Sequence, residues 1–130
     1  MRELRRLEEI TGWLDGAGGL SESLLDELTL TRHGYSVHLA LKVIIDRDGQ
    51  VLDKPLRVTF DLDGVHLLSL CGGLTPSMVD HPERINWGLS EVALVRVVPH
   101  PRGVLFEALW EDTRKVEVIC AQVSMIIPIG

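Results

Sequence analysis

Side chains able to do chemistry gather between residues 72 and 90, within the stretch GGLTPSMVDHPERINWG. Trp and Arg dominate protein interfaces more often than other residues, and a long ordered loop on a rigid scaffold often carries function. We therefore predict a partner-binding surface here, and a structural cover for one end of a sheet is the alternative. The surface consists of Asp80, His81, Glu83, Arg84 and Trp87.

The strongest candidate nucleophile is Cys71, which ends an apolar run beside Gly72-Gly73. A reactive thiolate needs a nearby base or a helix N-terminus. His81 lies ten residues further on and reaches the thiol only if the loop folds back. An enzyme with a site near Cys71 and His81 is therefore kept as an alternative function, and no catalytic residue is assigned.

The spacing of histidines and carboxylates predicts neither a metal nor a cofactor. No H-x-H or H-x-x-x-H pair occurs among the five histidines. The Asp-x-Asp-Gly stretches at 46–49 and 61–64 lack the central glycine and the late glutamate of a calcium loop. Asp and Gly are instead the residues that turns require.

Composition limits the class of partner and the compartment. The net charge of −6 argues against nucleic acid. Cys71 and Cys120 fit no metal spacing and lie in apolar runs, which predicts two buried free thiols in a reducing compartment. The N-terminus is too charged for a signal peptide, and no apolar run approaches the ~20 residues of a membrane span. We expect a cytoplasmic protein that does not contact membranes.

The elements that would position these residues begin with an N-terminal helix within residues 1–15. Leu4, Leu7, Ile10 and Leu14 form its apolar stripe, and glycines at 16, 18 and 19 end it. The following LSESLLDEL allows either one more helical turn, capped by Ser21 or Ser23, or the start of a strand.

From residue 28 the hydrophobic period changes to two. The clearest strand is 35–45, which places apolar side chains at odd positions and polar ones, such as Ser36 and His38, at even positions. A strand starting at Pro55 follows, and Asp63-Gly64 is predicted to turn the chain into a separate strand, VHLLSLC. Residues 28–71 thus form a first strand group, 72–90 a loop with short helical turns, and 91–127 a second strand group.

We predict one α+β, mainly β domain spanning residues 1–130. The N-terminal helix packs on an antiparallel meander of about seven strands, and the pattern leaves open a sandwich or a strongly curled sheet. Strands 92–98 and 104–126 carry apolar side chains on both faces, so each face must pack against another element or another copy of the chain. A self-associating scaffold domain, with a second copy as that cover, is therefore an alternative function.

The segments LLDELTL, YSVHLALKVI, LRVTFDLDGVHLLSL, NWGLSEVAL and VLFEALW resemble, in their order, a family of small immunity proteins from bacterial polymorphic toxin systems. The family's His-Asp before the first strand stands here as Leu25-Asp26. The resemblance implies a cytoplasmic protein that binds a cognate toxin rather than catalysing a reaction. An acidic chain would also attract a basic partner, so the expected function is a non-enzymatic protein-binding module.

Overall fold

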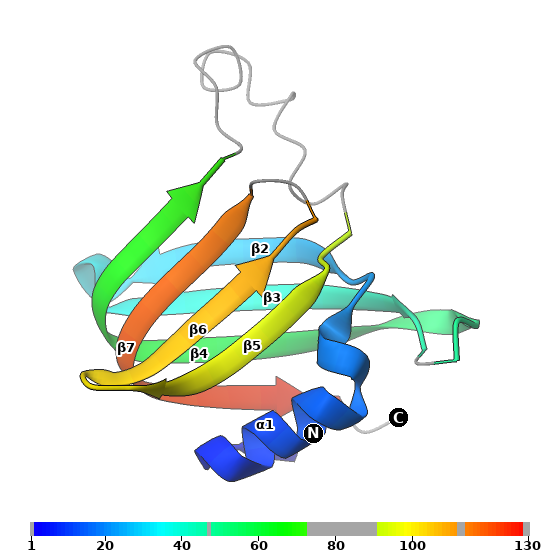
Figure 1. Ribbon diagram of the computed structural model, residues 1–130, viewed down its shortest axis with the longest axis horizontal. Coiled ribbons are helices and arrows are strands. Elements are labelled where there is room, and N and C mark those ends of the chain that lie inside the picture. Colours follow the sequence, from blue (N-terminus) through cyan, green and yellow to red (C-terminus); the bar gives the residue numbers. More distant parts are fainter. Residues whose placement is uncertain (1, 47, 73–90, 112–113, 129–130) are drawn as a thin grey trace.

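Seven strands and one α-helix are present in the computed structural model, which describes residues 2–46, 48–72, 91–111 and 114–128 (Figure 1). Two short 3-10 turns, Gly18–Leu20 and Arg32–Gly34, precede β2 and β3. The elements are β1 (Arg2–Leu4), α1 (Leu7–Gly16), β2 (Leu24–Thr31), β3 (Ser36–Ile45), β4 (Val51–Cys71), β5 (Leu94–His100), β6 (Gly103–Leu109) and β7 (Lys115–Ile127).

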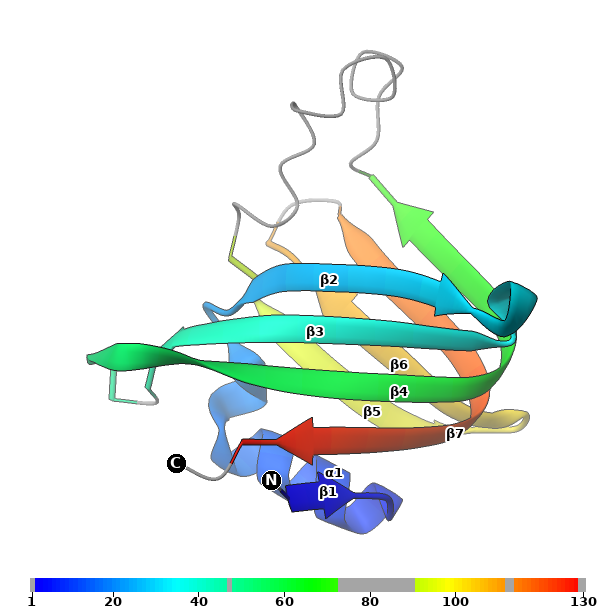
Figure 2. The same ribbon diagram turned by 180° about the vertical axis from the view of Figure 1, so that it is seen from behind.

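All seven strands belong to one antiparallel sheet with the order β2-β3-β4-β7-β6-β5, and β1 pairs with β7. The sheet does not close into a barrel. Two three-stranded meanders are joined where β4 pairs with β7. The predicted fold class, a mainly β domain with a helix packed on an antiparallel sheet, is confirmed. Of the two architectures left open, the strongly curled single sheet is the observed one (Figures 1 and 2).

The curl arises because β4 and β7 are long and take part in both halves of the sheet. In the β2–β3 half, the first part of β4 lies between β3 and the end of β7. In the β5–β6 half, the last part of β4 pairs with the start of β7, and β6 and β5 follow. Phe60 and Phe106 meet between the halves with ring centroids 5.0 Å apart, so the core lies inside the curl.

The predicted turn at Asp63-Gly64 is wrong, because β4 runs through it as a single strand of 21 residues. Gly64 has φ +68°, and the register with β7 shifts between Val65 and Leu67. The chain there leaves β3 but stays paired with β7 on both sides of the glycine. A glycine with positive φ serves equally well in a bulged bend and in a hairpin turn, so composition alone did not distinguish them.

Pro55 is likewise inside β4 rather than at a strand start. It lies between the pairs Ile45–Val51 and Val43–Leu56, where the register with β3 shifts, and it has no Cα partner. Proline is tolerated at such an irregular position because no ladder hydrogen bond from its nitrogen is required.

The N-terminal helix is shorter than predicted. Arg2–Leu4 forms β1, which pairs with β7 through Ile127, and α1 spans Leu7–Gly16. Leu4 is buried as the stripe predicted, but it reaches the core from a strand, because pairing with β7 overrides local helix preference. After the 3-10 turn the chain enters β2 at Leu24, so the strand alternative for LSESLLDEL is the observed one.

The two cysteines are free thiols in different environments. Cys120 is buried in the core and opposite Val65, whereas Cys71 is exposed and opposite Lys115. The predicted burial of Cys71 is therefore wrong, because its residue ends β4 on the outer face. Within the described residues, no helix is both long and apolar enough to cross a membrane.

Candidate binding cleft on the outer sheet face

The five predicted site residues, Asp80, His81, Glu83, Arg84 and Trp87, lie outside the described residues. Their role as a partner-binding surface stays a prediction, as does any pairing of His81 with Cys71. The described member of that pair, Cys71, has its Sγ atom 3.2 Å from Ser69 Oγ.

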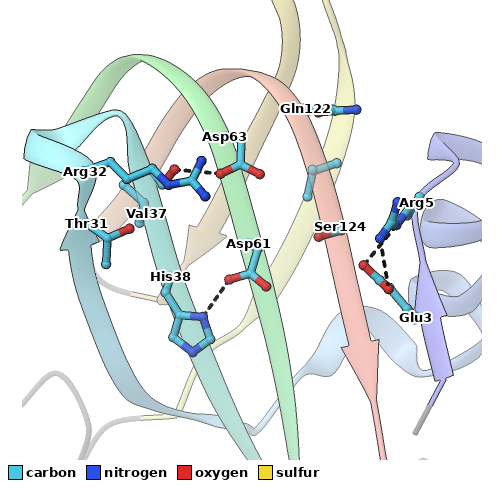
Figure 3. A pocket seen from close by; sticks show the side chains of 12 residues that line it. Glu3, Arg5, Thr31, Arg32, Val37, His38, Asp61, Asp63, Gln122 and Ser124 are labelled. Carbon is cyan, nitrogen blue, oxygen red and sulfur yellow. Dashed lines mark hydrogen bonds and ion pairs between the residues drawn. The ribbon is translucent and has the colours of Figure 1, made fainter.

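A polar cleft with a volume of about 410 Å³ lies on the outer face of the β2–β3 half (Figure 3). Strands β3, β4 and β7 form its floor, and β1 and the β2–β3 turn form its rims. Its polar lining consists of Glu3, Arg5, Thr31, Arg32, Ser36, His38, Asp61, Asp63, Gln122 and Ser124.

Strand alternation places the two floor carboxylates outward. Phe60 and Leu62 of β4 are fully buried in the core, so Asp61 and Asp63 point to the opposite face. On β3, His38 lies opposite Asp61 and Ser36 lies opposite Asp63. On β7, Ser124 and Gln122 occupy the corresponding positions. The register of three strands therefore builds the floor.

Each floor carboxylate is held from the β3 side through one oxygen. Ser36 Oγ donates a hydrogen bond of 2.6 Å to Asp63 Oδ1, and Ser36 is only 8% exposed. His38 Nδ1 lies 2.7 Å from Asp61 Oδ1. Hydrogen bonds to carboxylates are short and strong. In the described part of the chain, Oδ2 of each aspartate has no protein partner, so both can accept a hydrogen bond from a bound group.

His38 also contacts a network of ion pairs that links β2 to β4. Its Nε2 atom lies 3.3 Å from Glu27 Oε2, and Arg57 Nη2 lies 3.4 Å from Glu27 Oε1. Arg57 also donates to Asp26. The register of β2 shifts between Leu25 and Glu27, and such a bulge turns two successive side chains toward one side. That is why Arg57 reaches both carboxylates.

The arrangement limits His38 as a general base. Both ring nitrogens of His38 face carboxylate oxygens, of Asp61 and Glu27. A general base needs a nitrogen within hydrogen-bond reach of the substrate's proton, and here both are engaged. Among the described residues, no three His, Cys, Asp or Glu side chains are placed to hold a metal ion.

The rims carry two guanidinium groups. Arg5 on the β1 side makes a two-pronged contact with Glu3, with Nε–Oε1 at 3.0 Å and Nη2–Oε2 at 3.3 Å. This hydrogen bond raises the pKa of the Arg5 guanidinium. Arg32 extends from the β2–β3 turn across the cleft toward Asp63 (Figure 3). The cleft therefore presents fixed negative charge at its floor, the Glu3–Arg5 ion pair at its β1 rim and the positive charge of Arg32 at its other rim.

Sequence reasoning placed Ser36 and His38 on a polar strand face, which is where they lie. It placed Asp61 on the polar face of the strand after Pro55 and Asp63 in a turn, and it missed the role of both in the cleft. The available signal was Asp-x-Asp alternating with Phe60 and Leu62 within one strand. The sequence does not show the strand register that places these aspartates opposite His38 and Ser36 of β3.

Comparison of the chain with family models, with curated proteins and with solved structures finds no match in any of the three. The immunity-protein resemblance therefore stays a prediction.

Proposed function

We propose that this chain is a non-enzymatic protein-binding module whose cleft receives a basic side chain of a partner protein. The observation that carries the proposal is the pair of carboxylates, Asp61 and Asp63, each fixed through Oδ1. A lysine or arginine of the partner would bind to their second oxygens. Because the carboxylates are held in place beforehand, little conformational entropy is lost when they bind.

The rims restrict which basic segment fits. Arg5 is paired with Glu3, so Arg32 is the rim residue that repels a run of positive charges and attracts an acidic residue beside the inserted one. A partner surface on which a lysine or arginine is flanked by acidic residues is therefore favoured. The net charge of −6 would also speed the encounter with a basic partner.

An immunity-like protein that neutralises a basic toxin in the cytoplasm is one form of this function. Both cysteines are free thiols, which supports the cytoplasmic placement because disulfides are rare in reducing compartments. His38 is disfavoured as a general base because both of its ring nitrogens face carboxylates.

The test is capture of a partner from the source cell by the tagged chain, followed by measurement of its affinity. The variant Asp61→Asn/Asp63→Asn should weaken binding about tenfold or more, since hydrogen bonds to charged groups contribute about 1.5–3 kcal/mol each. Asp15→Asn/Asp53→Asn changes the net charge equally at exposed positions and should preserve affinity. Equal weakening by both variants would show that net charge, and not the cleft, attracts the partner.

The predicted loop surface is tested with the same partner. Trp87→Ala or Arg84→Ala should weaken capture without unfolding the chain if the loop extends the interface. Unchanged binding by Trp87→Ala, or loss of the fold, would assign the loop to a structural cover.

Self-association is the second candidate, and the outer face of the β5–β6 half favours it. A row of apolar side chains crosses four neighbouring strands there: Val98, Leu105, Ile119 and Leu67. Leu67 is 42% exposed, and the face is uncovered by any described element (Figure 1). Apolar rows of this kind mark interaction surfaces, and a second copy would present the same row.

Light scattering on the purified chain decides this alternative. A dimer that Ile119→Lys converts to a monomer would establish the interface. A monomer at all concentrations up to the millimolar range would remove self-association as the function.

A further inference from the structure

A second hollow, distinct from the polar cleft, is lined by the end of α1, the 3-10 turn after it and the β3–β4 hairpin. Figures 1 and 2 show where α1 and the hairpin lie in the fold. It is a groove with a volume of about 620 Å³. One wall is the end of α1 with the following 3-10 turn, and the other is the hairpin. Its apolar lining consists of Trp13, Ala17, Leu20, Val43, Ile45, Leu52, Leu56, Val58 and Ile127.

At the floor of this groove, the hydrophobic core reaches the surface of the molecule. Val58 and Leu20 are buried, while Val43 and Trp13 pack against the core and remain partly exposed. Small-molecule sites are typically concave, mostly apolar and about 300–1,000 Å³ in volume. The groove has these properties, whereas the cleft on the outer face of the β2–β3 half has a mostly polar lining.

The charged residues that line the groove, within the described chain, are all acidic: Glu22 on one wall, and Asp46 and Asp48 on the other. Asp46 is fixed, because its Oδ1 atom accepts hydrogen bonds of 2.9 Å from the backbone nitrogens of Asp48 and Gln50. Glu22 is anchored through its backbone, which donates to Val92 O at 2.7 Å. Negative charge therefore faces the groove from both sides.

Trp13 adds a further preference for positive charge. Its indole lines the groove from α1, and a cation over an indole face is attracted by the ring. An apolar floor, an acidic rim on both walls and an indole together match a ligand with a hydrocarbon body and a single cationic head.

We propose that this groove binds a small cationic amphiphile, such as an alkylammonium compound, with its hydrocarbon part on the Val58 floor and its head between Glu22 and Asp48. Apolar contact supplies the affinity, because each buried methylene is removed from water. The rim supplies the selectivity, because an anionic head of the same length would face three carboxylates. This site is independent of the protein-binding cleft.

The test is calorimetric titration of the full chain with three probes below their micelle concentrations. Decyltrimethylammonium should bind at one site per chain and at least tenfold more tightly than decyl sulfate. Tetramethylammonium, which lacks the hydrocarbon body, should show no measurable binding. Equal binding of the sulfate would overturn the role of the rim, and binding at many sites would overturn a defined groove.

Variants locate the site. Glu22→Gln/Asp48→Asn should weaken decyltrimethylammonium binding about five- to tenfold. It should also reduce the difference in affinity between decyltrimethylammonium and decyl sulfate. Glu8→Gln/Glu111→Gln removes the same charge at exposed positions outside the groove lining and should leave binding unchanged. Equal weakening by both pairs would refute the proposal.

A filling variant tests the floor. Ala17→Phe places a ring in the groove and should abolish binding while circular dichroism shows the native sheet. If Ala17→Phe does not fold, Leu52→Asp serves instead, since this partly buried side chain lies on the hairpin wall. Full binding by either folded variant would place the probe elsewhere and refute the proposal.

Discussion

The bend of β4 at Gly64 gives the most specific test of the fold, because the sequence predicted a turn between two strands here and the structure shows a bend within one strand. Gly64 has φ +68°, and a Cβ atom added there would lie 2.7 Å from Ala121 Cβ. Replacing Gly64 with alanine therefore introduces two costs: a left-handed backbone conformation and a steric overlap with the neighbouring strand.

The two costs can be estimated separately. A non-glycine residue in the left-handed region costs about 1 kcal/mol or slightly more, and overpacking costs about 1–3 kcal/mol. We expect Gly64→Ala to lower the free energy of unfolding by about 3 kcal/mol. Gly49 has φ +82° but no atom within 4 Å of an added Cβ, so Gly49→Ala should lose only the backbone cost of about 1 kcal/mol.

A compensating substitution isolates the overlap. Ala121→Gly removes the atom that the new side chain would meet, at a cost of about 0.5–1 kcal/mol for a glycine in a strand. The double variant Gly64→Ala/Ala121→Gly should then lose only about 2 kcal/mol, which is about 2 kcal/mol less than the sum of the single losses.

The assay is equilibrium unfolding in urea, followed by tryptophan fluorescence and far-ultraviolet circular dichroism. If the losses of the two single variants simply add in the double variant, Gly64 and Ala121 are not in contact. If Gly64→Ala costs no more than Gly49→Ala, the close approach of β4 to β7 at the bend is refuted.

Two further predictions concern the core. Phe106→Ala should lower the free energy of unfolding by about 4 kcal/mol, since the ring is fully buried against Phe60. The control Val51→Ala, at a residue 78% exposed, should change the free energy of unfolding by less than about 0.5 kcal/mol. Equal effects of the two variants in urea titrations would contradict the observed packing of Phe106. Burial raises the pKa of the Cys120 thiol from 9.0 to about 11, so its neutral form stabilises the folded state below pH 9 and this stabilisation is lost as the pH rises toward 11. Between these pH values the chain should lose about 2 kcal/mol more stability than its Cys120→Ala variant; parallel pH profiles would show that Cys120 is not buried in this way.

In α1, β3 and the first part of β4, the sequence by itself determined which side chains face inward. Alternation of apolar and polar residues along β3 and β4 separated Leu39 and Phe60 from His38 and Asp61, because strand geometry alternates side chains regardless of the partner strand. The same local logic gave the buried face of α1, with Ile10 and Leu14 in the core. These assignments depend only on neighbours along the chain.

The tertiary structure alone decided how the strands are matched. Asp61 meets His38, and Asp63 meets Ser36, through a register between β3 and β4 that a shift of one residue would abolish. The link from Arg57 to Glu27 depends on a bulge in β2.

The N-terminal residues and the bend show the same limit. Arg2–Leu4 became a strand only because β7, more than a hundred residues later, offered it an edge. Gly64 became a bend and not a turn because β7 continues beside it. Pairing energies between distant segments outweigh local preference, and for this reason the candidate cleft emerged only once the strands were placed side by side.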